Sequence, residues 1–319
     1  MTFFVHPTTP PANLTNNSGT RKDMKNSKVH VAIILAVLAA VVTIVSLSAR
    51  SSRGQAPRPK KTSRVTPAEP ARTTTTNANA SAAFAAAATQ NMQLRNELSW
   101  TYGGKEQRGW YLYDLLISKT LDTQHDATTS DFAAALASWQ KRTRLRADGV
   151  LDQEALMRMV SLWQSNRLKS REYPDPSQLV TGSPADFYDP GRAPEMRQIE
   201  RNTYAAYQEM IAAAQADPSL KLGPKDRYLK IISSFRSREY QDQLRAKSPN
   251  SGTAGLAVNS PHFTGRALDL YVGGDPVDTK DSNRAIQVNT PAYRWLVRNA
   301  ERFGFRPYFY EPWHWEYVK

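Results

Sequence analysis

The 319-residue chain contains no cysteine. Disulfides, thiolate metal sites, iron–sulfur clusters and thiol nucleophiles are therefore all excluded. Histidine is also scarce, with five residues in the chain. Asp and Glu number 29 against 42 Lys and Arg, which gives a formal net charge of +13. The rest of the composition, with 40% hydrophobic and 22% charged residues, excludes wholesale disorder, and the length favours two modules.

The excess positive charge lies mostly near the N-terminus. Residues 1–90 hold 11 Lys and Arg against 2 Asp and Glu (net +9), which leaves 31 against 27 (net +4) for residues 91–319. Such a charge favours an anionic partner: nucleic acid, acidic lipid or an anionic polymer. A nucleic-acid-binding face would interleave basic and aromatic residues on a folded surface, and this excess lies outside the segments that we expect to fold. We therefore expect no nucleic-acid partner.

A long apolar run extends from Val29 to Ala49 and contains no Asp, Glu, Lys, Arg, Pro or Gly. As a helix, these 21 residues would span about 31 Å, close to the hydrocarbon thickness of a bilayer. The run predicts an N-terminal transmembrane helix at 29–49, an uncleaved signal anchor that follows a short cytoplasmic tail at 1–28. A cleaved signal peptide is the alternative. Basic residues flank the run on both sides, and their count leans slightly towards a cytoplasmic C-terminal side.

Changes in composition divide the remaining chain. Residues 50–104 are rich in Pro, Thr and Ala and predict a disordered linker whose Ala-rich end could form a short helix. Residues 105–165 predict a small three-helix module, with Ser130–Asp131 and Asp152 as candidate helix caps. A Pro-rich connector follows at 166–190.

The C-terminal region, residues 191–319, mixes predicted helices and strands without a regular βαβ repeat. We expect helices from Glu195 to Ala216 and from Pro291 to Phe303, and strands near residues 228–233, 267–272 and 308–318. This order predicts an α+β domain with a small, mainly antiparallel sheet flanked by helices.

The three-helix module carries an ordered motif. Phe132-x-x-Ala135-x-x-x-Trp139-Gln140 is followed by the run Ala147-Asp-Gly-Val-Leu-Asp152. This motif resembles the peptidoglycan-binding type 1 domain, and the resemblance implies a cell-wall-binding module with peptidoglycan as its partner. The same apolar residues would also form the core of any small bundle. A run of basic residues predicts either a solvated face or a contact with acidic wall polymer, and consists of Lys141, Arg142, Arg144 and Arg146.

Two segments of the C-terminal region carry candidate metal ligands. His262 lies in a loop that leads into a predicted strand containing Asp269, and His314 lies in the segment Glu311-Pro-Trp-His314. Two imidazoles and one carboxylate, with a fourth position for water, are the ligand set of a catalytic zinc site. Glu311 could then act as a general base on that water. Each residue alone could be an ordinary strand or loop residue, and the H-E-x-x-H helix of many metalloproteases is absent.

Three motifs occur together: S-S-F-R-S at 233–237, S-x-H-x-x-G-x-A-x-D at 260–269 and E-P-W-H at 311–314. Together they resemble the VanY-like LAS group of zinc D-alanyl-D-alanine carboxypeptidases. The resemblance implies Zn²⁺ as the cofactor and, as its ligands, His262, Asp269 and His314. It also implies that Glu311 is the catalytic base and that Arg236 binds substrate and stabilises the developing oxyanion. Ser260 matches a serine that lies close to the substrate.

These features predict a zinc-dependent peptidoglycan peptidase, a D-alanyl-D-alanine carboxypeptidase that removes the terminal D-Ala from stem peptides. A peptidoglycan endopeptidase is the alternative enzyme, and a non-catalytic cell-wall-binding protein is the alternative of another class. The substrate's terminal carboxylate needs a cation, for which Arg236 or Arg238 is available, and the motif position favours Arg236. Because peptidoglycan lies outside the membrane, we expect a single-pass protein of the bacterial cytoplasmic membrane with its C-terminal domains outside, against the weak count of flanking charges.

Overall fold

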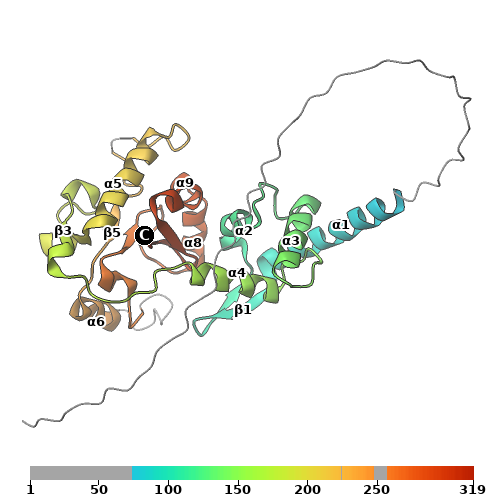
Figure 1. The fold of residues 1–319 in the computed structure, drawn as a ribbon, viewed down its shortest axis with the longest axis horizontal. Helices are drawn as coiled ribbons and strands as arrows, with labels where there is room; N and C mark the ends of the chain where they lie inside the picture. Colours follow the sequence, from blue (N-terminus) through green and yellow to red (C-terminus); the bar gives the residue numbers. More distant parts are fainter. Residues whose placement is uncertain (1–73, 224, 248–256) are drawn as a thin grey trace, which may run out of the picture. The chain divides into compact units, whose positions relative to one another are not determined.

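A computed structural model describes residues 74–223, 225–247 and 257–319 (Figure 1). The predicted tail at 1–28, the predicted transmembrane helix at 29–49 and the first part of the predicted linker lie outside the described residues. Within the described ranges, no helix is both long enough and apolar enough to cross a membrane.

Residues 74–165 form a helical module with a small antiparallel hairpin. Two side chains set helix starts: Thr129 Oγ1 accepts from the backbone N–H of Phe132, and the Asp152 carboxylate accepts from that of Ala155. Asp152 is a predicted cap, whereas the predicted cap at Ser130–Asp131 lies just inside its helix. The elements are α1 (Thr74–Glu97), β1 (Ser99–Tyr102), β2 (Lys105–Arg108), η1 (Tyr111–Tyr113), α2 (Asp114–Leu121), α3 (Ser130–Arg142) and α4 (Gln153–Ser165).

The module begins earlier than the sequence predicted, because α1 and β1 occupy the range assigned to a disordered linker at 50–104. Asn91 is wholly buried; its side chain donates to the Gly149 carbonyl at 2.8 Å and accepts from the Leu151 N–H at 2.7 Å. A small apolar cluster joins the same regions, formed by Ala87, Ala133 and Val150. The alanine-rich sequence shows no amphipathic stripe, so the periodicity gave no sign that α1 packs against α3.

The C-terminal domain is built on a four-stranded antiparallel sheet with strand order β5-β6-β8-β7. A second sheet pairs β3 with β4, also antiparallel. This arrangement confirms the predicted α+β class with small, mainly antiparallel sheets. The strands are β3 (Leu179–Thr181), β4 (Gln198–Glu200), β5 (Ile231–Ser233), β6 (Ala267–Leu270), β7 (Phe305–Tyr308) and β8 (Glu311–Tyr317).

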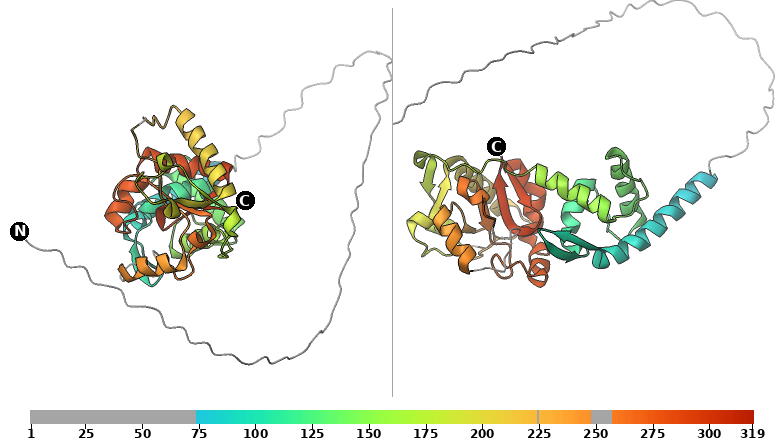
Figure 2. Two further views of the ribbon diagram at one scale, coloured as in Figure 1. Left: turned by 90° about the vertical axis from the view of Figure 1, so that its left-hand side faces the viewer. Right: turned by 90° about the horizontal axis from the view of Figure 1, so that it is seen from below.

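Helices surround this sheet (Figures 1 and 2). The first begins at Arg201 rather than at the predicted Glu195, because residues 194–197 form a 3-10 turn and residues 198–200 pair as β4. Glu200 caps this helix by accepting from the N–H groups of Asn202 and Thr203 at 3.0 and 2.8 Å. The helices are α5 (Arg201–Ala216), α6 (Arg238–Lys247), α8 (Asp281–Val288) and α9 (Pro291–Asn299), which continues as the 3-10 turn η7 (Ala300–Phe303).

The helical module and the C-terminal domain share one hydrophobic core. At their contact, the guanidinium of Arg284 in α8 is buried, with 1% of the residue exposed. It donates to Gln107 Oε1 and Tyr113 Oη of the module at 3.3 and 3.2 Å, and to the Tyr310 carbonyl at 3.2 Å. Arg284 Nη2 also forms an ion pair with Asp281 Oδ1 at 2.6 Å. A buried charge is tolerated only with such partners, so Arg284 ties the two parts together.

We expect Arg284→Ala to lower the free energy of unfolding by roughly 3 kcal/mol, because it removes a buried charged group and leaves its acceptors unpaired. Urea unfolding followed by circular dichroism measures this loss. Arg294→Ala, at an exposed position of the adjacent helix, is the control and should change the free energy by less than about 0.5 kcal/mol. Equal stability of the two variants would contradict the assigned role of Arg284.

Candidate functional site

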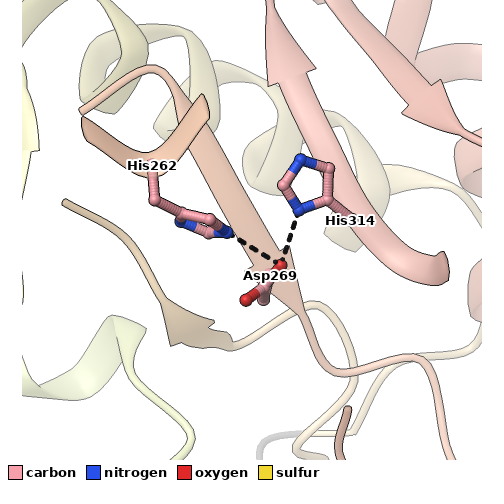
Figure 3. A group of neighbouring side chains, drawn as sticks. All are labelled: His262, Asp269 and His314. Carbon is pink, nitrogen blue, oxygen red and sulfur yellow. Dashed lines mark hydrogen bonds and ion pairs between the residues drawn. The ribbon is translucent and has the colours of Figure 1, made fainter. Parts of the chain in front are cut away.

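Strand register places two of the predicted ligands next to each other. Asp269 in β6 pairs directly with His314 in β8, so their side chains project from the same face of the sheet. His262 lies in the 3-10 turn η6 (Pro261–Thr264), which precedes β6. Figure 3 shows the two imidazoles facing the Asp269 carboxylate. The three residues are buried, and their ligand atoms lie within 4.8 Å of one another.

The turn that carries His262 is fixed at both ends. Ser260 caps it, with Oγ accepting from the His262 N–H at 3.3 Å. Gly265 ends it with a φ of +67°, in the left-handed region that favours glycine. The Gly265 carbonyl accepts from the Glu200 N–H at 3.1 Å, and a Cβ at this position would lie 2.9 Å from the same nitrogen and 3.2 Å from Leu179 Cδ2. The two-stranded sheet of β3 and β4 therefore helps to place the His262 turn.

Hydrogen-bond partners fix the tautomer of His262 and the orientation of both imidazoles. His262 Nδ1 lies 2.7 Å from the Ser234 carbonyl, which can only accept, so Nδ1 carries a proton and Nε2 faces Asp269 Oδ1 at 3.2 Å. His314 Nε2 lies 3.2 Å from the Glu316 carboxylate, and its Nδ1 lies 2.9 Å from Asp269 Oδ1. His262 Nε2, His314 Nδ1 and a carboxylate oxygen thus converge on one point, and these atoms could hold a metal ion.

The protonation states of the two imidazoles differ. Burial, reinforced by the nearby Arg236, lowers the pKa of His262 to about 4, so its ring is neutral near pH 7. Its Nε2 lone pair then faces a carboxylate oxygen with no proton between them. Burial opposes the protonation of His314, but hydrogen bonds to Asp269 and Glu316 raise its pKa to about 9. His314 is therefore protonated near pH 7 and donates to both carboxylates, so a metal ion bound among the three residues would replace the proton on His314 Nδ1.

The buried Asp269 carboxylate is also paired with Arg236, whose Nη2 donates to Oδ2. Burial alone would raise the pKa of Asp269, but His262 and Arg236 hold it well below its usual range. Arg236 further donates through Nε to Ser233 Oγ at 2.8 Å and through Nη1 to Gln241 Oε1 at 3.2 Å. A guanidinium has five N–H donors, so two remain for a bound molecule.

Glu311 lies at the start of β8, with 6% of the residue exposed. Its Oε2 lies 3.9 Å from His314 Nδ1. Burial raises the pKa of Glu311 to about 8, opposed by His314 and reinforced by the charge of Asp269. A buried carboxyl with a raised pKa beside a ligand cluster is the pattern of a general acid or base.

The predicted site residues meet in one cavity of about 570 Å³. Its lining includes all six of them, Arg236, Ser260, His262, Asp269, Glu311 and His314. Three further arginines also line it, Arg167, Arg171 and Arg192. Arg238, the alternative cation for a substrate carboxylate, does not line this cavity, and its guanidinium lies 5.3 Å from the centre of the Phe263 ring. Tyr102 of the β1–β2 hairpin lines the cavity as well.

Glu316 is a site residue that the sequence analysis did not identify. It lies two residues after His314 in β8 and therefore projects from the same face. Burial opposes its ionisation, but the hydrogen bond from His314 and the pairing with Arg167 lower its pKa to about 2. The sequence did contain a signal for Glu316: side chains two residues apart in a strand lie on the same face, which places Glu316 beside His314.

Residues 196–319 match the family model of VanY, D-alanyl-D-alanine carboxypeptidase. The matched residues include all six predicted site residues. None of the curated proteins compared with the chain matches it. The match does not extend to residues 105–165, whose wall-binding role stays a prediction.

Two solved structures are similar to parts of the chain. One is described as the structure of the LdcB LD-carboxypeptidase that reveals the molecular basis of peptidoglycan recognition; it is 23% identical and covers 46% of this chain and 70% of its own, with a TM-score of 0.34. The other is VanYB in complex with D-alanine-D-alanine, 24% identical over 38% of this chain and 72% of its own, with a TM-score of 0.27.

We expect Asp269→Ala to weaken Zn²⁺ or Co²⁺ binding more than 100-fold, since even outer partners of metal ligands typically contribute about 10–100-fold. Competition with a chromophoric chelator measures the affinity. His125→Ala removes an exposed histidine of the helical module and should bind metal as the wild type does. Equal metal affinity of the two variants would exclude this cluster as the metal site.

Proposed function

We propose that the protein is a zinc-dependent peptidoglycan peptidase, a D-alanyl-D-alanine carboxypeptidase that removes the terminal D-Ala from stem peptides. One observation carries the proposal: His262, Asp269 and His314 converge in a cavity that Glu311 and Arg236 also line. Zinc fits the donor set, because two imidazole nitrogens and one carboxylate oxygen leave a coordination position open, as in catalytic zinc sites. The family match at residues 196–319 supports the carboxypeptidase class.

The residues around the cluster have separate roles in the proposed reaction. A bound Zn²⁺ would polarise the scissile carbonyl and lower the pKa of water. Glu311 accepts a proton from the attacking water and delivers it to the leaving amine, for which its raised pKa is suited. Arg236 has two donors that its bonds to Ser233, Gln241 and Asp269 do not use, and these would stabilise the negative charge that develops on the carbonyl oxygen. Ser260 caps the turn that carries His262 and so keeps this ligand in position beside the substrate.

The arginines of the cavity favour a carboxypeptidase over an endopeptidase. Arg171 donates to the backbone carbonyls of Leu168 and Ser170, and Arg192 to that of Ile232. Within the described residues, neither forms an ion pair with a carboxylate. A peptide with a free C-terminal carboxylate would supply that missing negative charge, whereas an internal peptide bond would not.

Glu311→Gln should lower kcat by at least about 100-fold while leaving Zn²⁺ bound, because the amide keeps the shape but cannot take a proton. Release of D-alanine from purified stem pentapeptide measures kcat, and chelator competition measures the metal. The matched control is Glu154→Gln, an exposed position in α4 with expected wild-type turnover. Loss of zinc together with activity would instead make Glu311 a metal ligand.

The full-length protein should release one D-alanine from each stem peptide, and a chelator should stop the release. Mass spectrometry of digested muropeptides distinguishes this product from a cut within the stem or cross-link, which would identify an endopeptidase. Binding to peptidoglycan with no released product, in the presence of zinc, would identify a non-catalytic wall-binding protein and refute the proposal.

The location of the protein is also part of the proposal. Residues 29–49 would anchor it in the cytoplasmic membrane, and the module of residues 105–165, with its exposed basic residues Lys141, Arg142, Arg144 and Arg146, would bind the wall polymer. A reporter fused to Lys319 should be active only on the outer side of the membrane. A cytoplasmic C-terminus would separate the enzyme from peptidoglycan and contradict the proposed substrate.

A further inference from the structure

A buried ion pair lies directly behind His314. Glu316 is 0% exposed, and its carboxylate accepts from His314 Nε2 at 3.2 Å. The same oxygen accepts from Arg167 through Nε at 3.1 Å and through Nη2, while the other accepts from the Leu168 N–H at 2.9 Å. Both carboxylate oxygens are therefore satisfied, and one of them joins an arginine to the imidazole.

The partners of Glu316 lie in the segment directly after the helical module. Arg167 and Leu168 follow α4, whose C-terminal cap is Asn166. The Arg167 guanidinium lies 3.9 Å from the centre of the Tyr308 ring, and its Nη1 donates to Gln164 Oε1 of α4 at 3.2 Å. These contacts hold the guanidinium in one place. The segment that positions Glu316 is thus 149 residues away in sequence and lies outside the VanY match.

The geometry points to a positioning role for this pair. A buried carboxylate that accepts from one imidazole nitrogen orients the ring and directs the other nitrogen at the metal. We propose that Arg167 and Glu316 hold His314 with Nε2–H donated to Glu316 and Nδ1 directed at Asp269 and His262, so that the segment directly after the helical module completes the metal site of the C-terminal domain. This inference rests on the metal site of the proposed function and adds to it the source of that site's geometry.

Charge and hydrogen-bond geometry are both needed in this arrangement. Glu316→Gln keeps the size of the side chain but removes the charge that attracts the imidazole N–H and neutralises Arg167. Arg167→Ala leaves the Glu316 carboxylate buried without its cation. Either change frees His314 to rotate, so each should weaken metal binding by about 10–100-fold, the range typical of such outer partners.

The test measures the affinity of the full-length protein for Zn²⁺ by chelator competition, together with the visible absorption spectrum of the Co²⁺ form. Glu316→Gln and Arg167→Ala should each lose affinity and show an altered Co²⁺ spectrum. Because the two residues act as one unit, the double variant should lose little more than either single variant. Arg158→Ala, an exposed arginine on α4, is the matched control and should bind as the wild type does.

Chemical rescue separates positioning from general stability. Arg167 lines the cavity, so guanidinium ions at millimolar concentration can reach the space left in Arg167→Ala. They should restore Zn²⁺ affinity at least several-fold, and they should leave Glu316→Gln unchanged. If Arg167→Ala does not fold, Arg167→Lys tests the same point, since an ammonium lacks the paired donors and should bind zinc more weakly than the wild type.

Unchanged zinc affinity and Co²⁺ spectra in folded variants would overturn the inference and leave the proposed function intact. A lower melting temperature with unchanged affinity would have the same meaning and would assign the pair to stability alone. Absence of zinc binding in the wild type would refute the metal site itself, and both proposals with it.

Discussion

The buried charge of Asp269 is the constraint on which the C-terminal domain depends. A carboxylate with 1% exposure is stable only if cations or donors surround it, and here the His314 imidazole and the Arg236 guanidinium do so. The sheet provides this because Ser233, Asp269 and His314 are register partners across β5, β6 and β8. The pairing that forms the centre of the sheet therefore also brings together two of the three candidate metal ligands, Asp269 and His314. A slip of one residue in either pairing would turn the carboxylate away from its partners.

A second feature is that buried polar and charged groups of the C-terminal domain have their partners in the helical module or directly after it. Arg284 of the C-terminal domain donates to Gln107 and Tyr113 of the module, and Arg167, directly after the module, pairs with Glu316. Separating the two parts would leave Glu316 without its cation and Arg284 without two of its acceptors. The contact between them thus combines apolar packing with specific hydrogen bonds and an ion pair, unlike a flexible attachment of two independent domains.

The sequence predicted what depends on local patterns and missed what depends on distant contacts. His262, Asp269, His314 and Glu311 were found because their motifs are short and their side chains carry recognisable chemistry. The α+β class followed from the order of the elements. The cap at Glu200 was missed because the apolar spacing of the following helix extends upstream into β4. The pairing of Arg167 with Glu316 spans 149 residues, and no local pattern in either segment indicates the other.

The absence of a side chain at Gly265 has a consequence for how the site can vary. The turn that carries His262 is hydrogen-bonded to β4 through backbone atoms, the Glu200 nitrogen and the Gly265 carbonyl. A hydrogen bond between backbone atoms uses groups that are present whichever side chains the two residues carry. This hydrogen bond thus fixes the position of His262 relative to β4. Side chains of β3 and β4 that point away from the turn can therefore change while this hydrogen bond is kept, whereas a side chain at position 265 would collide with the Glu200 nitrogen.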